Sequence, residues 1–317
     1  MNEVVHFPVL LNEIKQIVRE YVKGREKIVF VDCNLGLGGH SSEILPLLPK
    51  SSMIYLIDKD IESMEIAKKR LEKNIKCQDK KNVSFLNISF RDFFSQNLNS
   101  LLASREYFFI ILMDLGISYY QIKNQEGFSY LQNTFLDMRY DKQGKINAYY
   151  VVNYFSEQEL FEIFDKVFEN QKISRKIVKS IINQRAKNEI KFTFDLNKAI
   201  SKAVSQKFLK DCLQKSYLAL RIAVNDELNE LQNALDFIIN TNFNMLLLII
   251  SYHSLEGRII KNFVKSLKES FKSNFKSKEF LEKCETVISK IKPHKEEVMI
   301  NKPSRSAILW KIVRNCN

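Results

Sequence analysis

The sequence predicts an α/β protein in which a doubly wound parallel sheet carries an inserted all-helical domain. Short apolar runs alternate with amphipathic stretches between residues 28 and 113, as in consecutive strand–helix–strand units. Residues 123–214 have helical periodicity with no convincing strand, after which the earlier alternation resumes. We therefore expect a discontinuous sheet domain at 1–122 and 215–317, with a helical insertion at 123–214.

The N-terminal elements follow from the spacing of apolar residues. A one-sided apolar stripe predicts a helix over residues 9–22. Tyr107–Met113 is an uninterrupted apolar run, typical of a central parallel strand that is buried on both faces. The other elements expected here are strands at 28–31, 53–57 and 83–86 and helices at 42–48 and 61–74.

The later elements are predicted in the same way. Helical periodicity is clearest at residues 157–168, 174–185 and 196–207, and a long helix is expected from Tyr217 to about Asn240. The apolar run at 245–251 predicts another strand. The Lys/Ser/Phe-rich stretch 266–289 is expected to be helical or partly loose, and 305–312 is expected to form an edge strand.

Composition limits the class of protein. Five scattered cysteines without a C-x-x-C pair support neither a zinc site nor a disulfide framework. The first residues do not resemble a signal peptide, and the longest apolar run, 245–250, is too short to span a bilayer. We therefore expect a cytoplasmic protein with no membrane partner.

The charge of the chain is unevenly distributed. Its net charge is +12, and residues 258–317 contain 15 Lys/Arg against 6 Asp/Glu. An excess of this kind favours a polyanionic partner, most simply nucleic acid. Compositional drift is the alternative, because the whole chain is rich in Lys, Asn, Ile and Phe.

A glycine-rich loop follows the first predicted strand. That strand ends at Asp32, and three glycines occupy positions 36, 38 and 39 just before a helix expected to begin near Ser41. Glycines let the backbone approach a ligand closely. Asp58, at the end of the second strand, is placed to accept hydrogen bonds from ribose hydroxyls. A merely tight strand-to-helix turn is the alternative interpretation.

The loop lacks the third glycine of the dinucleotide-binding fingerprint, and His40 stands where a pyrophosphate needs bare backbone. A cofactor without a pyrophosphate therefore fits better. S-adenosylmethionine meets this requirement, with its ribose at the acid and its amino-acid moiety at the glycine loop.

Further polar residues follow the other predicted strands. The region around Phe90, Asp114 and the run Ser251-Tyr252-His253 should converge with the glycine loop, since open α/β sheets bind ligands at the carboxyl ends of their strands. Each residue also has a structural explanation. Asp114 suits a helix cap, Phe90 suits the core, and His253 suits a buried histidine.

The run Ser118-Tyr119-Tyr120-Gln121 follows Asp114 closely. An acid followed by a short polar and aromatic motif resembles the arrangement in amino-methyltransferases that act on bases. Such chemistry needs acceptors for the hydrogens of an exocyclic amine, and tyrosines can stack on a flipped or single-stranded base. Ordinary loop packing is the alternative for the two tyrosines.

These motifs, in this order, are similar to those of the bacterial 16S ribosomal RNA cytosine-N(4) methyltransferase family, also called MraW. The likeness extends from His6 to Ala307, nearly the whole chain. It rests on the runs Leu35–Ser41, Asp114–Gly116, Gly127–Arg139, Ala219–Leu228 and Tyr252–Arg258. The resemblance implies a class I S-adenosylmethionine-dependent methyltransferase domain, with a Rossmann-like doubly wound sheet and a helical insertion for substrate recognition.

The resemblance also implies roles for residues. It places S-adenosylmethionine contacts at Gly38, Gly39, His40, Asp58, Phe90, Asp114 and Gln121. Asp114, Ser118 and His253 are the expected catalytic residues. The expected RNA-binding residues are Tyr119, Tyr120, Asp137, Arg139, Arg221, Asn225 and Arg258. The family methylates the exocyclic amine of a decoding-centre cytidine in 16S rRNA of the assembled small ribosomal subunit, and a homodimer is possible.

The chain departs from the family pattern at several positions. Tyr119-Tyr120 replaces a Ser-Pro pair, Asp211–Lys215 replaces a His-Pro motif, and Trp310 stands where arginine is usual. These changes leave a second hypothesis open, a ribosome-assembly factor that binds the small subunit with little or no turnover. A DNA amino-methyltransferase is weaker, since nothing resembles a separate sequence-reading domain.

Overall fold

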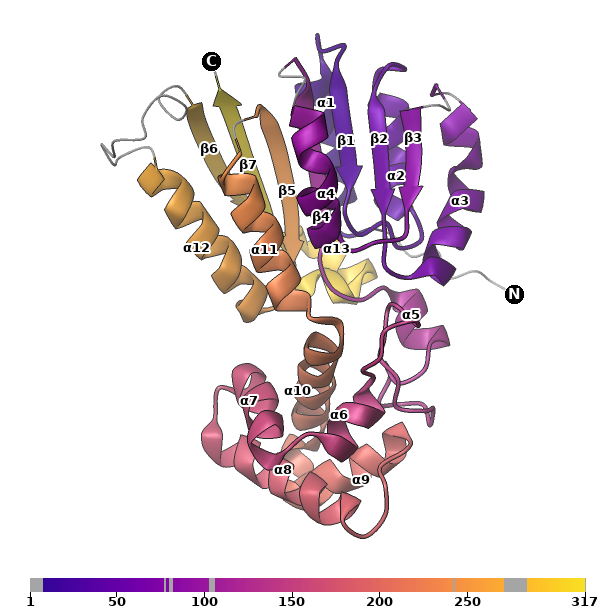
Figure 1. Ribbon diagram of the computed structural model, residues 1–317, viewed down its shortest axis with the longest axis vertical. Helices are drawn as coiled ribbons and strands as arrows, with labels where there is room; N and C mark the ends of the chain where they lie inside the picture. The colour runs from indigo at the N-terminus through magenta and orange to yellow at the C-terminus, as the bar shows by residue number, and fades with distance from the viewer. Residues whose placement is uncertain are drawn as a thin grey trace. The chain divides into compact units, whose positions relative to one another are not determined.

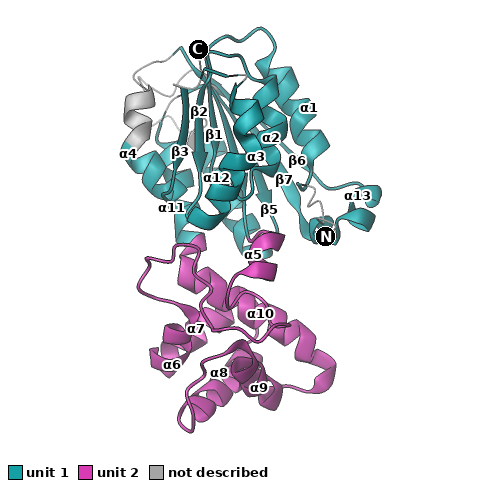
Figure 2. Ribbon diagram, turned by 90° about the vertical axis from the view of Figure 1, so that its right-hand side faces the viewer, with its two compact units in different colours: residues 1–116, 228–317 teal, residues 117–227 magenta. Residues whose placement is uncertain are grey.

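The computed structural model describes residues 8–76, 78–79, 82–102, 106–241, 243–270 and 284–316 (Figure 1). The first two residues of the family-like sequence, His6 and Phe7, lie outside these ranges. The chain forms two compact units, one made of residues 1–116 and 228–317 and the other of 117–227 (Figure 2). Both expected domain boundaries, at residues 122 and 215, fall within the second unit.

A seven-stranded sheet forms the centre of the first unit, in the order β3-β2-β1-β4-β5-β7-β6. Neighbouring strands from β3 to β5 are parallel, and β7 is antiparallel to both β5 and β6. The strands are β1 (Ile28–Asp32), β2 (Met53–Ile57), β3 (Val83–Leu86), β4 (Phe108–Asp114), β5 (Met245–Ser251), β6 (Cys284–Ile291) and β7 (Ile308–Cys316). The predicted α/β class is confirmed.

Helices cover both faces of this sheet, each face with its own apolar core. One core packs α1 (Leu11–Val22), α2 (Gly39–Ile44) and α3 (Ile61–Lys76) against the sheet, and the other packs α4 (Phe90–Leu102), α11 (Glu227–Ile239) and α12 (Ser254–Ser270). Figure 1 shows α11 and α12 on the same side as α4. The short elements η1 (Leu45–Leu47), α13 (Lys295–Ile300) and η3 (Lys302–Ser306) complete the unit.

The second unit is helical and has a separate core. Its helices are α5 (Tyr119–Asn124), α6 (Ala148–Tyr154), α7 (Glu157–Phe168), α8 (Gln171–Arg185), α9 (Thr193–Ala203) and α10 (Gln206–Asn225). Extended pairing among its described residues is limited to one isolated bridge, between Phe135 and Phe192. No helix in the described ranges has the length and hydropathy needed to cross a membrane.

Three expected helices have different bounds in the structure. The helix expected at 42–48 begins at Gly39, and α-helical geometry ends at Ile44, because Pro46 has no amide hydrogen for the helical ladder. The stretch 196–207 is divided by extended backbone at Val204. The long helix expected from Tyr217 is divided at Asp226, whose φ of +55° is left-handed, a conformation that Asp tolerates better than most residues.

The C-terminal strands also differ from expectation. The segment expected as an edge strand forms β7, an interior strand, because β6 pairs along its outer side. Most of β6, residues 284–289, falls within the stretch expected to be helical or loose. Its residues alternate apolar and polar side chains only imperfectly, so the strand period was weak in the sequence.

Candidate cofactor and catalytic site

The carboxyl ends of β1, β2 and β4 carry the three expected acids of the first unit. Asp32 ends β1, Asp58 follows β2, and Asp114 ends β4. Because β2, β1 and β4 are parallel neighbours, these acids lie along one edge of the sheet. The convergence expected from the sequence is therefore present.

The glycine loop after β1 is joined directly to Asp58. Gly36 has a φ of +52°, and its amide donates a hydrogen bond of 2.6 Å to Asp58 Oδ2. Gly38, the N-cap of α2, has a φ of +75°, and a Cβ there would meet Leu71 at 3.2 Å. Both positions favour glycine, so the loop geometry depends on the residues that the sequence analysis singled out.

Asp58 is held in place but keeps a partly exposed side. Its Oδ1 accepts a hydrogen bond from the Asp60 amide at 2.8 Å, in addition to the bond from Gly36. Burial raises its pKa from 3.8 to about 7, although these two amides act in the opposite direction. Each carboxylate oxygen has a second lone pair, so Asp58 can accept further hydrogen bonds from a ligand.

Asp32 has a different environment from Asp58. It is 1% exposed, and Oδ2 accepts a hydrogen bond of 2.5 Å from the Ser41 hydroxyl. Burial raises its pKa to about 6, which the bond from Ser41 partly offsets. We interpret Asp32 as the residue that ties the first turn of α2 to the end of β1.

Asp114 lies between two side chains that the sequence did not connect to it. The Tyr252 hydroxyl donates to Oδ1 at 2.7 Å, and His40 Nδ1 lies 3.4 Å from Oδ2. The other ring nitrogen of His40, Nε2, lies 2.9 Å from the Val9 carbonyl oxygen, which requires a hydrogen on Nε2. His40 thus links the start of α1 to the end of β4.

Tyr252 is the main site residue that sequence reasoning missed. It was noted within the strand-end run Ser251-Tyr252-His253, but the expected role went to His253. Burial raises the pKa of Tyr252 well above its usual value, with the Asp114 charge acting in the same direction. The phenol is therefore a hydrogen donor to Asp114 throughout the physiological pH range. A tyrosine after a central strand was the available signal.

His253 and Phe90 have mainly structural surroundings. His253 Nδ1 accepts from the Glu256 amide at 3.4 Å, and Glu256 Oε2 accepts from the Tyr252 amide at 2.7 Å, which caps α12. Phe90, the first residue of α4, is 6% exposed and belongs to an apolar core. Their expected catalytic and cofactor roles stay predictions. Arg258 is exposed on α12.

Ser118 and Gln121 form a reciprocal cap at the start of α5. The Ser118 hydroxyl accepts from the Gln121 amide at 3.2 Å, and Gln121 Oε1 accepts from the Ser118 amide at 3.0 Å. Tyr119 and Tyr120, which replace the family's Ser-Pro, occupy the first helical turn, where proline is tolerated but is not needed. Tyr119 is 42% exposed.

The residues expected to bind RNA at Asp137, Arg139, Arg221 and Asn225 bind one another's segments. Asn225 Nδ2 donates to the Met138 carbonyl at 2.8 Å, and its Oδ1 accepts from the Tyr140 amide at 2.9 Å. The Arg139 side chain donates to Asp137 at 2.6 Å, and the Arg221 side chain donates to Glu227 at 2.8 and 3.0 Å. The two bonds of Asn225 clamp the 137–140 loop to the end of α10.

Two further features show how specific this clamp is. Gly127 has a φ of +86°, and a Cβ there would lie only 2.6 Å from the Asp137 amide nitrogen. Burial alone would raise the pKa of Asp137, but hydrogen bonds from Arg139 and Lys142 hold it below its usual value. Asp137 and Asn225 are 4% and 5% exposed. The clamp is therefore a buried structural network.

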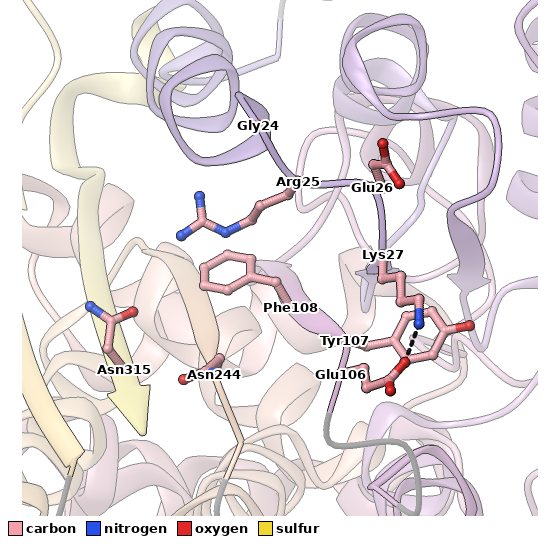
Figure 3. Close-up of a pocket in the computed structure, with 9 residues that line it drawn as sticks. All are labelled: Gly24, Arg25, Glu26, Lys27, Glu106, Tyr107, Phe108, Asn244 and Asn315. Atoms are coloured by element: carbon pink, nitrogen blue, oxygen red, sulfur yellow. Dashed lines mark hydrogen bonds and ion pairs between the residues drawn. The ribbon is translucent and has the colours of Figure 1, made fainter. Parts of the chain in front are cut away.

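A pocket of about 570 Å³ lies at the opposite, amino edge of the sheet (Figure 3). The Arg25 guanidinium stands 4.3 Å from the centroid of the Phe108 ring, and Lys27 pairs with Glu106. The pocket is lined by Gly24–Lys27, Glu106–Phe108, Asn244 and Asn315. None of these residues was expected in the cofactor site. The glycine loop, Asp58 and Asp114 lie at the other edge of the sheet.

The glycine loop is suited to S-adenosylmethionine by two observations. A Cβ built on Gly36 would meet nothing within 4 Å, so the loop backbone faces open space beside Asp58. Asn34 Oδ1, in the same loop, is buried and has no hydrogen-bond partner among the described residues. A ligand with hydroxyl and ammonium donors matches these acceptors. The described residues hold no cluster that would bind a metal ion.

Comparison with known proteins is consistent with the resemblance. Residues 3–315 match the model of the family described as "MraW methylase family". The "Ribosomal RNA small subunit methyltransferase H" of Clostridium botulinum strain Loch Maree is 38% identical, with 97% of this chain and 98% of that protein aligned. The proteins of the same name from Hydrogenobaculum sp. and Sulfurihydrogenibium sp. are 35% and 36% identical, over 96% of this chain in each case and 94% and 98% of theirs.

Proposed function

Because this chain belongs to the MraW methylase family, we propose that it methylates small-subunit ribosomal RNA with S-adenosylmethionine as donor. More narrowly, we propose the exocyclic N4 amine of a decoding-centre cytidine in 16S rRNA as the acceptor. The observation that carries the proposal is the carboxyl edge of the sheet, where Asp58 faces the glycine loop and Asp114 is held by Tyr252 and His40.

Residues of the glycine loop and β2 would hold the cofactor. Asp58 would accept hydrogen bonds from the ribose hydroxyls, while Gly36 leaves the backbone bare for the methionine moiety. Gly38, which packs closely against Leu71, would set the turn of the loop. His40 is buried and already engaged at both ring nitrogens, so we assign it to positioning Asp114. Gln121 and Phe90 remain proposed contacts for the adenine end.

S-adenosylmethionine supplies a methyl group on a positively charged sulfur, which an amine nitrogen can attack directly. The chain's part is therefore to orient the amine and to accept its hydrogens. Asp114, fixed by the Tyr252 hydroxyl, would accept one amine hydrogen and so localise the lone pair on the nitrogen. Ser118 would offer a second acceptor through the remaining lone pair of its carbonyl, which also accepts from the Ile122 amide, since its hydroxyl caps α5.

The balance of the reaction assigns one more task to this site. A new N–C bond forms as the S–C bond breaks, and the amine nitrogen gives up one proton. Asp114 would take this proton first and become a neutral carboxyl group, and because its side chain is 26% exposed it would release the proton to solvent after the transfer. His253, which caps α12, has no part in the transfer under this proposal.

Single-turnover assays on purified small subunits that lack the modification test the proposal. Labelled methyl groups should appear in 16S rRNA, and mass spectrometry of its nucleosides should detect N(4)-methylcytidine. Methylation of a different nucleoside would overturn the narrower proposal and leave rRNA methylation in place.

The assembly-factor hypothesis predicts a different result in the same assay. Such a protein would bind the cofactor and the small subunit normally but would transfer no methyl group. If the unmutated protein binds the cofactor and the small subunit but transfers no methyl group, the proposal that it is an active methyltransferase is excluded.

A further inference from the structure

Helix α6 of the second unit exposes an aromatic pair to solvent. Tyr150 and Tyr154 are 45% and 57% exposed, and their ring centroids lie 5.1 Å apart with the planes inclined at 33°. Because they are four residues apart, both lie on the same face of the helix. Large aromatic side chains are normally packed in a protein interior. A pair that stays exposed to solvent therefore makes this face of the helix a candidate binding surface.

The backbone that carries the pair is firmly held. The Asn147 side chain caps α6 by accepting from the Tyr150 amide at 2.8 Å. Asn153 exchanges two hydrogen bonds of 3.0 Å with the backbone of Ile190, and Arg185 donates to the Val152 carbonyl at 2.8 Å. The helix therefore presents its exposed rings on a fixed support.

Two further aromatic residues, Tyr149 and Phe135, support the position of Tyr154. The Tyr149 and Tyr154 hydroxyls lie 3.4 Å apart, and the Tyr149 ring packs against Phe135 with centroids separated by 5.5 Å. Little side-chain freedom is then lost when a ligand stacks on the pair, and this favours binding.

The segment of residues 185–191, which is hydrogen-bonded to α6 through Arg185 and Ile190, carries an excess of positive charge. Lys187 and Lys191 are exposed within it, and Lys145 is exposed just before α6. Its one acid, Glu189, is paired with Lys191 at 3.2 Å and also accepts hydrogen bonds from the Tyr149 and Tyr154 hydroxyls. Cations beside exposed rings fit a ligand that has both phosphates and flat faces. Single-stranded RNA has this combination, whereas in duplex RNA the base faces are stacked inside the helix.

We propose that Tyr150 and Tyr154 form a stacking platform for unpaired bases of the rRNA substrate, with Lys187 and Lys191 contacting the adjoining phosphates. The inference rests on the proposed function for the identity of its RNA partner. It adds a binding surface of the second unit, distinct from the residues at 137, 139, 221 and 225 that the sequence suggested for RNA.

Binding of a labelled single-stranded RNA and of its duplex to the full-length protein tests the platform. Stacking is worth about 1–3 kcal/mol per base, so replacing both tyrosines with alanine should weaken single-strand binding about five- to a hundredfold. Duplex binding should change little. Tyr150→Phe with Tyr154→Phe should restore binding, because the rings and not the hydroxyls stack.

The salt dependence of binding separates the two kinds of contact. Loss of stacking should leave the slope of affinity against salt unchanged, while Lys187→Ala with Lys191→Ala should flatten it by about 0.7 per lost phosphate contact. Phe208→Ala is the matched control, since Phe208 is another exposed aromatic of the second unit, 56% exposed and beside Lys207. It should bind RNA like the unmutated protein.

The outcomes distinguish this inference from the proposed function. Unchanged single-strand affinity in the double alanine variant, with normal methyl transfer by the unmutated protein, overturns the platform and leaves the proposed function in place. Loss of single-strand affinity without any methyl transfer by the unmutated protein supports the platform and overturns the proposed function. Calorimetric unfolding should show an unchanged transition of the second unit in the double variant, which confirms that the unit carrying α6 is folded.

Discussion

The carboxyl edge of the sheet and the clamp of the helical unit use polar residues in opposite ways. At the edge, the Asp114 side chain is 26% exposed, and Tyr252 donates to only one of its two oxygens. In the clamp, Asn225 is 5% exposed and uses its amide group to bind the backbone of Met138 and Tyr140. Both sets of residues belong to the sequence motifs on which the family resemblance rests.

The difference lies in what remains available to a ligand. A carboxylate oriented by neighbours but partly exposed keeps lone pairs for a substrate or cofactor. A buried amide that bonds the backbone on two sides has most of its capacity already used, and it determines the shape of a loop. We therefore expect substitutions at the edge to impair chemistry, and substitutions in the clamp to impair folding of the second unit.

The largest effect is expected for Asp114→Ala, which should lower the rate of methyl transfer at least about a hundredfold through lost orientation of the amine. Stability should fall by about 1–3 kcal/mol, since the buried Tyr252 hydroxyl loses its acceptor, and rates are therefore compared at a temperature where the variant is folded. Tyr252→Phe removes only the 2.7 Å bond to Asp114 and should have a smaller effect, about tenfold. Single-turnover kinetics with labelled cofactor measure both, and equal rates for Asp114→Ala and the unmutated protein would remove Asp114 from the site.

Asn225→Ala should produce the converse result. It leaves the buried Met138 carbonyl and Tyr140 amide without their partner, and we expect a loss of about 2–4 kcal/mol in the stability of the second unit. Calorimetric or denaturant unfolding measures this loss. Cofactor affinity, which depends on the first unit, should be unchanged. A stable variant with weakened RNA binding would instead restore Asn225 to the RNA contacts that the resemblance implied.

Much of the sheet was predictable from local sequence. β2 and β5 have the bounds that their apolar runs predicted, because strands in the interior of a parallel sheet are largely buried. β3 also has its predicted bounds, although it is an edge strand whose residues are only half-buried. β6 was missed, since an edge strand has a weaker pattern and Val287 is 62% exposed. The helix break at Asp226 depends on one left-handed residue, which periodicity cannot detect.

The site was predictable only in part, for a related reason. Strand ends and glycines are visible along the chain, so the position of Asp58, Asp114 and the glycine loop at one edge of the sheet was predicted. Side-chain pairings between distant segments were not visible, as with Tyr252, which is bonded to Asp114 across 138 positions. A sequence motif does not show whether its residues contact a ligand or another part of the chain. Asn225 contacts another part of the chain, the backbone of Met138.

The raised pKa of Asp58 sharpens the comparison through pH. Burial raises this pKa to about 7, so the carboxyl is increasingly protonated below neutral pH. Binding of ribose hydroxyls favours the ionised form, and cofactor affinity should therefore rise with pH through about 7 and then level off. Calorimetric titration between pH 5.5 and 8.5 measures this dependence. Asp58→Ala should lower the affinity by about 1–3 kcal/mol at high pH and abolish the dependence.

Protein stability should respond to the same group with the opposite sign. The stabilising contribution of protonated Asp58 is complete below the unfolded pKa of 3.8 and is lost as pH rises through about 7. Unfolding temperatures of Asp58→Ala should therefore improve, relative to the unmutated protein, as pH rises across this range. A constant difference between the two proteins would mean that Asp58 titrates near its ordinary value.

The smallest effect concerns the basic C-terminal part of the chain. If α12 contacts RNA phosphates, Lys265→Ala with Lys268→Ala should flatten the salt dependence of small-subunit binding by about 0.7–0.9 per lost contact. A third lysine of this series, Lys272, lies outside the described residues. Lys69→Ala with Lys73→Ala is the matched control, because α3 packs on the opposite face of the sheet from α12. An equal slope for both double variants would mean that the charge excess acts through the overall field, with no phosphate contact at Lys265 or Lys268.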